Sequence, residues 1–457
     1  MSLKSNRARR AVWEAGVKHC TFDPEGPGVV RIHLIPPVYR PFKKAESLVI
    51  LNGYYILPLG YTLAQLLASF IDEINAFDGK SISEEDEKRI FENTARTVSK
   101  IYPHVDRETI AEDLEDLLDV LFEVARGGTP SVDLEKLSVR SYAPHMAAPH
   151  RVDVMVAAMT DAEGKWQCNQ KCAFCYAAGQ PHGKSAEMTT AEWKIALDRL
   201  REARVPMVTF TGGEPTLRAD ILELVDHAKW FVTRLNTNGA ALTEDLVKGL
   251  KKASLDSLQV TLYSADPAIH HRLTGAEHHA DTVAGIRRAV EAGLDVSVNT
   301  PLCRANADYA STLSLIHSLG VRFITISGLI CTGGAAGKHH ANDLTSEELY
   351  EIVRKAKSFC DEHDMELDFT SPGLIPADQL DELGMNIPSC GACLSNMAIT
   401  PDGTVVPCQS WLDADAGLGH ILRDDWKNIW THPVCRALRG MTEEQALSCP
   451  FRRREEV

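Results

Sequence analysis

Short apolar runs alternate with amphipathic helical stretches from residue 150 to residue 330. Six of the runs are predicted strands, at 150–159, 207–213, 231–239, 257–264, 295–303 and 323–330. Helical periodicity fills the intervals at 189–203, 219–229, 243–253, 279–292 and 308–319. Strands joined by helical crossovers build a parallel sheet, and the loops that follow the strands gather at one edge of it. The pattern therefore predicts an α/β domain whose active site lies at the carboxyl ends of its strands.

Three cysteines follow the first predicted strand. Cys168, Cys172 and Cys175 stand in CNQKCAFCY with a C-x3-C-x2-C spacing. Three thiolates can hold three irons of a four-iron cluster and leave the fourth iron open to a ligand, whereas a structural metal site normally takes four protein ligands. The spacing therefore predicts chemistry at iron.

This spacing resembles the signature of the radical S-adenosylmethionine (SAM) enzymes, and TFTGGEPTLR at the end of the second predicted strand resembles their GGE motif. The resemblance implies a partial (β/α)6 barrel over residues 148–340, with a 4Fe-4S cluster on the three cysteines and SAM at its open iron. It implies reductive cleavage of SAM to a 5'-deoxyadenosyl radical, which abstracts hydrogen from a substrate. A flavodoxin- or ferredoxin-type protein is the implied reductant.

The same resemblance suggests which residues contact SAM. Gly212 and Gly213 let the backbone approach a ligand closely, and Glu214 can accept hydrogen bonds from the methionyl amine. Phe174 is expected to pack against the adenine. Polar residues at the tips of the next three strands resemble contacts to the ribose and carboxylate: Asn238, Ser264 and Asn299. The alternative for each of these three is a turn-capping role.

A second group of cysteines lies near the C-terminus, after a predicted helix and linker at 341–384. CGACLSNMAITPDGTVVPC contains Cys390 and Cys393, a Pro-Asp-Gly turn, and Cys408. The turn lies between two β-prone runs, so a hairpin would return Cys408 to the first two cysteines. The segment resembles the start of the SPASM or twitch domains, which implies an auxiliary 4Fe-4S cluster within residues 385–457.

Two further cysteines, Cys435 and Cys449, follow this hairpin. At about four thiolates per cluster, the cysteines suffice for one auxiliary cluster and not for two. Cys449 is the favoured fourth ligand, because Cys435 lies in a predicted helix at a position typical of packing. A tetrahedral zinc site is the alternative for this cysteine set.

Residues 1–140 are expected to form a separate α+β domain. A strand is predicted at 29–34, and Asn52-Gly53 between two apolar runs is typical of a hairpin turn. Three helices should follow, at 62–75, from about Ser83, and at 106–125. The arrangement resembles the winged-helix-like domain that binds leader peptides in maturases of ribosomally made peptides. An unrelated helical cap is the alternative.

The leading hypothesis for the substrate is a ribosomally synthesised precursor peptide that receives a thioether or carbon–carbon crosslink. Epimerisation is the main variation, and it needs a hydrogen donor such as Cys303 or Cys331, although small buried side chains are the more ordinary role for both. The sequence is also compatible with oxidation of a small molecule, with maturation of a partner protein, and with a non-enzymatic iron-sulfur carrier. His270 and His271, in a predicted loop, are further acid–base candidates.

Composition excludes several other classes. The net charge of -15 argues against a nucleic-acid surface, which needs a concentrated basic face. No run approaches 18 apolar residues, and the N-terminus lacks the apolar region of a secretory signal, so no membrane partner and a cytoplasmic location are expected. The 12 cysteines cluster like metal sites and not like the disulfide framework of a small secreted domain.

Overall fold

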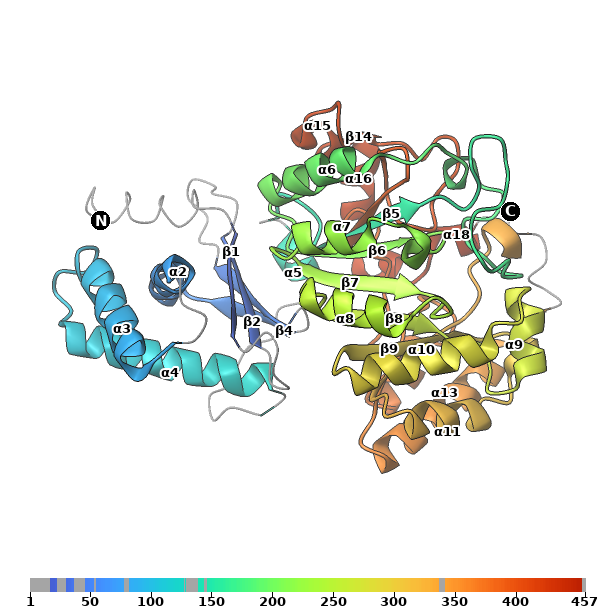
Figure 1. The fold of residues 1–457 in the computed structure, drawn as a ribbon, viewed down its shortest axis with the longest axis horizontal. Helices are drawn as coiled ribbons and strands as arrows, with labels where there is room; N and C mark the ends of the chain where they lie inside the picture. Colours follow the sequence, from blue (N-terminus) through green and yellow to red (C-terminus); the bar gives the residue numbers. More distant parts are fainter. Residues whose placement is uncertain are drawn as a thin grey trace. The chain divides into compact units, whose positions relative to one another are not determined.

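The computed structural model describes residues 17–22, 30–36, 46–52, 55–77, 82–126, 128, 139–143, 146–336 and 342–453. The chain divides into two compact units (Figure 1). The first comprises Met1–Ala148 with Leu200–Pro206, and the second comprises Pro149–Arg199 with Met207–Val457. None of the described helices is both long and apolar enough to cross a membrane.

The first unit contains a four-stranded antiparallel sheet in the order β1-β2-β3-β4. Its strands are β1 Lys18–Phe22, β2 Val30–Ile35, β3 Ser47–Leu51 and β4 Tyr55–Leu59. The predicted hairpin is confirmed, because β3 and β4 pair with Leu51 opposite Tyr55. Asn52 has a φ of 50°, as the turn requires, while Gly53 lies outside the described residues. Strand β1 was not predicted, since its five residues, KHCTF, carry no clear alternation of apolar and polar residues.

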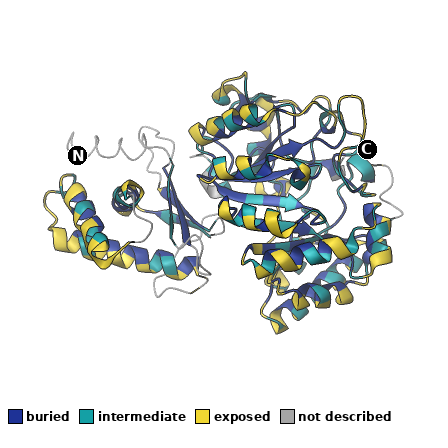
Figure 2. Cartoon of the chain, in the orientation of Figure 1, coloured by how far each residue is buried: buried dark blue, intermediate teal, exposed yellow. Residues whose placement is uncertain are grey.

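Three helices follow this sheet, at α2 Tyr61–Ala76, α3 Glu84–Ser99 and α4 Arg107–Ala125, and a short helix α5 spans Val139–Tyr142. The predicted helix starts are confirmed: Ser83 forms a capping box with Asp86, and Asp106 accepts a hydrogen bond from Thr109 N. Figure 2 shows helices with one buried and one exposed face. The buried face of α4 joins the core of the sheet and contains Ile110, Leu114, Leu117, Leu118 and Leu121.

The second unit is built on a ten-stranded sheet in the order β11-β10-β9-β8-β7-β6-β5-β12-β13-β14. Strands β5 to β11 are parallel, and they are Arg151–Ala157, Met207–Gly212, Val232–Thr237, Ser257–Thr261, Asp295–Pro301, Phe323–Ser327 and Glu366–Phe369. The associated helices are α6 Thr190–Glu202, α7 Ile221–His227, α8 Glu244–Lys252, α9 Pro267–Thr274, α10 His279–Glu291, α11 Ala310–Ser318, α13 Ser346–Glu362 and α14 Ala377–Glu382. The six predicted strands and the crossover helices between them are thus confirmed.

Helix α9 replaces the loop that was expected around His270. Asp266 caps its start by accepting a hydrogen bond from Ala268 N at 2.8 Å, Pro267 occupies the first turn, and Gly275 ends it with a φ of 66°. His270 is fully buried, as expected for a packing residue and not for a histidine that faces solvent. The Asp-Pro start and the glycine stop were readable signals of a short helix.

The C-terminal segment extends the same sheet. Strands β12 Asn396–Ile399 and β13 Thr404–Val406 form the predicted hairpin, and β12 pairs in parallel with β5. The remaining elements are β14 Gly419–His420, α15 Trp426–Trp430, α16 Pro433–Arg439, α17 Glu443–Ala446 and α18 Pro450–Arg453. Because β12 pairs with β5, the hairpin between Cys393 and Cys408 is joined by backbone hydrogen bonds to the strand that precedes the first cysteine motif.

Candidate functional site

The first cysteine motif follows β5, at the carboxyl edge of the parallel strands. Cys168 and Cys172 are partly buried and Cys175 is buried. Burial, with smaller contributions from the neighbouring Glu214 and Cys175, raises the pKa of Cys168 to about 12. Burial and the nearby Cys175 and Cys168 also raise the pKa of Cys172. The three thiols therefore lie close enough to affect one another, and without a metal they are neutral.

In the described part of the chain, there is no group of three or more His, Cys, Asp or Glu side chains close enough together to coordinate a metal ion. The donor chemistry nevertheless fits an iron-sulfur cluster, because three neighbouring thiols are available and a metal releases their protons when it binds. Three ligands, and not four, come from this loop, which leaves one coordination position for a ligand that is not supplied by the motif.

The last turn of α9 holds the middle of the cysteine loop. Thr274 O accepts a hydrogen bond from Lys171 N at 2.8 Å, and Leu273 O accepts one from Ala173 N at 2.9 Å. These two donors flank Cys172. Carbonyl groups at a helix C-terminus lack partners within the helix, so the cysteine loop satisfies them. Helix α9 therefore fixes the backbone on both sides of the central ligand candidate.

A glycine pair after β10 holds the other end of the loop. In the short helix η5 Gly333–Ala335, Gly334 N donates to Cys175 O at 2.8 Å. Gly333 has a φ of +57°, and a Cβ on it would lie 2.4 Å from Cys175 O and 2.3 Å from Tyr176 O. Only glycine permits this approach. Cys331, a hydrogen-donor candidate, is partly buried and lies two residues before Gly333.

The GGE segment packs on the end of β5. A Cβ on Gly212 would lie 2.2 Å from Ala157 O, and Gly213 N donates to the same carbonyl at 2.7 Å. A Cβ on Gly213 would lie 2.6 Å from Ala158 O. Close approach of two backbone segments is therefore the immediate reason for both glycines, which sequence reasoning attributed to a ligand.

Glu214 is a buried carboxylate beside the cysteine loop, and it is 2% exposed. Its Oε1 accepts hydrogen bonds from Thr216 N, Thr216 Oγ1 and Thr237 Oγ1, and its Oε2 accepts one from Asn238 N at 2.8 Å. Burial raises its pKa, while these four donors act in the opposite direction. Since each carboxylate oxygen has about two lone-pair sites, Oε2 retains room for one further donor such as an amine.

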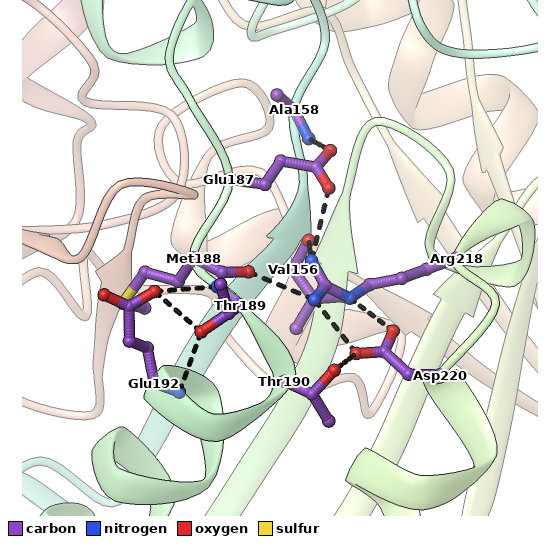
Figure 3. Close-up of polar contacts among 9 residues, drawn as sticks. All are labelled: Val156, Ala158, Glu187, Met188, Thr189, Thr190, Glu192, Arg218 and Asp220. Atoms are coloured by element: carbon purple, nitrogen blue, oxygen red, sulfur yellow. Dashed lines mark hydrogen bonds and ion pairs between the residues drawn. The ribbon is translucent and has the colours of Figure 1, made fainter.

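Arg218 connects the GGE segment to its surroundings through a network of hydrogen bonds and ion pairs (Figure 3). Its side chain is 10% exposed and forms a bidentate pair with Asp220, at 2.6 and 3.0 Å. Its remaining hydrogen bonds reach Val156 O, Met188 O and Glu187 Oε2. Glu187 in turn accepts from Ala158 N at 2.8 Å. One guanidinium thus ties the end of β5, the approach to α6 and the GGE segment together.

The strand-tip candidates have different surroundings. Asn238 Nδ2 donates to Asn169 Oδ1 at 2.6 Å, next to Cys168, while Asn238 Oδ1 accepts from Ala240 N at 3.0 Å. Ser264 Oγ accepts from Asp266 N at 3.1 Å. Both therefore have the turn-capping contacts that were their alternative role. Asn299 lies in β9, partly buried, on the face opposite the buried Val298 and Thr300.

A small apolar cluster lies against the cysteine loop. Phe174 and Cys172 pack with the buried Tyr263, Leu273, Cys303 and Leu329. Cys303 is fully buried, and burial raises its pKa. Its packing matches the ordinary role of a small buried side chain, yet its neighbours place it within the same cluster as two residues of the cysteine motif.

Five thiols come together in the C-terminal segment. Burial raises the pKa of Cys408 to about 12, with further contributions from Cys390 and Cys449. A hydrogen bond between Cys393 and Cys435, in which the Cys393 thiol is the donor, is the main reason that the pKa of Cys393 is raised, and Cys408 also contributes. Cys435 donates to Ile429 O at 3.3 Å and is fully buried. The donor set fits an iron-sulfur cluster, with one thiol more than four irons require.

Sequence reasoning missed the residues that hold the cysteine motifs in place. The glycines at 333 and 334, helix α9 and Arg218 carry no ligand chemistry, so a search for ligands could not select them. Besides the ends of α9, the available signal was a Gly-Gly pair soon after a predicted strand, because such a pair indicates close backbone approach.

The parallel βα units and the three-cysteine loop at their carboxyl edge define the class of iron-sulfur enzymes that work at an open iron. Residues 167–313 match the radical SAM superfamily, and residues 390–450 match SPASM, an iron-sulfur cluster-binding domain. The chain therefore contains a radical SAM domain and a C-terminal SPASM domain, whose cofactors are SAM, the SAM-binding 4Fe-4S cluster and an auxiliary iron-sulfur cluster. The expected fold class and family are confirmed.

Individual relatives extend this comparison. The PqqA peptide cyclase of Streptomyces rochei is 28% identical over 298 residues, which cover 63% of this chain and 79% of that protein. The crystal structure of Streptococcus suis SuiB bound to its precursor peptide SuiA matches with a TM-score of 0.59 and 14% identity, covering 87% of this chain and 88% of SuiB. The crystal structure of SuiB bound to S-adenosylmethionine matches with a TM-score of 0.57 and 16% identity, covering 89% of this chain and 90% of SuiB. The shared fold therefore extends beyond the two matched domains.

Proposed function

We propose that this enzyme modifies a ribosomally synthesised precursor peptide by forming a thioether or carbon–carbon crosslink. The observation that carries the proposal is the cyclase relative, whose name states a peptide substrate and which matches 63% of the chain. The fold shared with SuiB, a protein crystallised with a precursor peptide, supports the same substrate class.

In this proposal Cys168, Cys172 and Cys175 bind the first cluster, and Glu214 Oε2 accepts a hydrogen bond from the methionyl amine of SAM. Support comes from the remaining acceptor position on Oε2 and from its proximity to two of the cysteines. When bound, the cluster and SAM supply a 5'-deoxyadenosyl radical. Residues 148–340 form the catalytic domain, with Phe174, Gly212, Gly213, Asn238, Ser264 and Asn299 around the cofactor.

The auxiliary cluster is proposed to lie within residues 385–457, after the 341–384 linker. Cys390, Cys393, Cys408 and Cys449 are its ligands, and Cys435 is a hydrogen-bonding neighbour of Cys393. A crosslink removes two hydrogen atoms from the peptide: one ends on 5'-deoxyadenosine, and the other leaves as a proton and an electron. The auxiliary site is the proposed acceptor of that electron, and a flavodoxin- or ferredoxin-type protein is the proposed external reductant.

Residues 1–140 are proposed to bind the leader part of the peptide. Their sheet has two edge strands, β1 and β4, each paired on one side within the described sheet. An extended peptide can add to such an edge through backbone hydrogen bonds. Removal of this domain should weaken peptide binding without affecting the cysteine motifs.

The test is co-expression with short peptides encoded beside the gene, under anaerobic conditions. The expected product is lighter than the precursor by the mass of two hydrogen atoms, and fragmentation should place the linkage. An unchanged peptide mass, together with production of 5'-deoxyadenosine, would argue against crosslinking.

Epimerisation is the second candidate, because Cys303 belongs to the apolar cluster that Cys172 packs against, and Cys331 lies two residues before Gly333, which approaches the cysteine loop. A thiol there could return a hydrogen atom to the opposite face of a peptide radical. Epimerisation predicts incorporation of one deuterium from D2O without crosslinking, lost in Cys331→Ala or Cys303→Ala. No deuterium incorporation would exclude this candidate.

A further inference from the structure

Gln180 joins the two cysteine-containing loops through one buried side chain. Its Nε2 donates to Tyr176 O and, at 3.3 Å, to Ser410 O. Tyr176 directly follows Cys175, and Ser410 is two residues after Cys408. A single amide group therefore bridges segments that lie 230 positions apart in sequence.

The orientation of this amide follows from its partners. Both neighbours are carbonyl oxygens, which can only accept, so the NH2 group of Gln180 must face them. Its Oε1 is buried and has no hydrogen-bond partner in the described structure. An unpaired buried acceptor is unfavourable. The side chain is only 7% exposed, and it keeps this orientation because a flipped amide would set its oxygen against two carbonyl oxygens.

Neighbouring contacts reinforce the junction. Thr332 Oγ1 donates to Ser410 O at 3.4 Å, and Gly334 N donates to Cys175 O at 2.8 Å. His182 N, two residues after Gln180, donates to Leu412 O at 3.1 Å. The first cysteine loop, the segment after β10 and the segment after Cys408 therefore share one hydrogen-bonded junction.

We propose that Gln180 is a positioning residue that fixes the separation of the SAM-binding and auxiliary clusters. The inference rests on the proposed ligand assignment, because each bridged carbonyl belongs to a residue within two positions of a proposed ligand. Gln180 itself binds no iron, and its loss leaves every thiol in place. It acts by coupling the order of one loop to the other.

The experiment compares full-length wild-type protein with Q180M, which keeps the length of the side chain without its donors, and with Q180E, which sets a carboxylate oxygen against the carbonyls. The matched control is Q167L, since Gln167 lies in the same segment, is exposed, and contacts only Asp161 and Lys165 O through its side-chain amide. Hydrogen–deuterium exchange of residues 408–412 and pulsed EPR between the two reduced clusters are measured, with iron content determined for every sample.

Both Gln180 variants should retain wild-type iron content, while exchange at 408–412 becomes about tenfold faster, as expected for the loss of one buried hydrogen bond. The cluster–cluster distance distribution should broaden, and Q167L should behave like wild type. Wild-type exchange in Q180M and Q180E would overturn the inference. If wild-type protein binds a single cluster, the ligand proposal fails instead, and the exchange comparison, which needs no second cluster, still decides the role of Gln180.

Discussion

The two cysteine sites are built in opposite ways. The first places three thiols within eight residues, on one loop, and its backbone is held by α9 and by Gly334. The second gathers five thiols from residues 390–449. Two of them precede the β12–β13 hairpin, one follows it, one lies in α16, and one lies between α17 and α18. The first site is therefore local in sequence, and the second depends on tertiary packing.

This difference decides what spacing can reveal. In the first site, the C-x3-C-x2-C spacing identifies the ligand candidates, and the fold holds the backbone of their loop in place. In the second, Cys435 was expected to be a packing residue, and it is fully buried, yet it also forms a hydrogen bond with Cys393. Proximity alone therefore allows two choices of fourth ligand at the second site, whereas the motif of the first site offers only three candidate cysteines.

Replacing Cys172 with Ala should have the largest effect. The variant is expected to fall from about eight to about four irons per chain, because one four-iron cluster is lost while the auxiliary site remains. Production of 5'-deoxyadenosine should stop. Iron and sulfide analysis with chromatography of the reaction checks both. The control is Cys360→Ala, a buried cysteine in α13, which should keep all of its iron; loss of iron from both sites in C172A would show that the two sites do not assemble independently.

Cys449→Ala should remove the other half of the iron, about four irons per chain, and leave SAM cleavage intact. Cys435→Ala should retain this iron, because the thiol of Cys435 is already engaged with Cys393 and Ile429 O. Metal analysis of both variants under the same reconstitution decides the assignment. The reverse result would make Cys435 the ligand. Stoichiometric zinc in the wild-type protein would show that the second site is a zinc site and not an iron-sulfur cluster.

Gly333→Ala tests the backbone support of the first site. A Cβ would lie 2.3 Å from Tyr176 O, so the variant should lose about 3 kcal/mol of stability and part of its first cluster. The matched control is Gly384→Ala, which shares a positive φ but has nothing within 4 Å of the added Cβ. Thermal unfolding of both variants separates steric overlap from φ strain. Equal destabilisation would mean that the close approach to the cysteine loop is unimportant.

The elements of the parallel sheet were predictable because each strand and helix carries its own periodicity, as in DVSVNTP of β9, where buried and partly exposed residues alternate. Helix α9 was missed, since its eight residues are too short for such a signal, although Asp266, Pro267 and Gly275 marked its ends.

Long-range contacts explain which features of the candidate site could not be predicted from the sequence. The parallel pairing of β12 with β5 joins residues that are far apart in sequence, such as Ala398 and Asp153, and no local pattern encodes it. The bridge from Gln180 to Ser410 and the contact of Gly333 with Tyr176 O arise in the same way. Ligand candidates could be identified from residue type and spacing, whereas the residues that position them could not.

His270 offers the smallest and most selective test of how the first site is supported. Burial, with smaller contributions from the neighbouring His279, His271 and His278, lowers its pKa to about 4. The folded state therefore binds fewer protons than the unfolded state between about pH 6.5 and pH 4, so stability falls as the pH drops through this window. His270→Gln should reduce the loss of folding stability between pH 6.5 and pH 4 by about 1–3 kcal/mol, which is the upper part of the range for one titrating histidine.

The measurement is urea unfolding of wild type and H270Q at pH 7.5 and pH 5. At pH 7.5, H270Q should be slightly less stable, because His270 Nδ1 accepts a hydrogen bond from Tyr263 N at 3.4 Å and anchors α9 beside the cysteine loop. At pH 5 the difference in stability between the two proteins should become smaller or change sign. An identical pH dependence in both proteins would show that His270 is not the group that titrates.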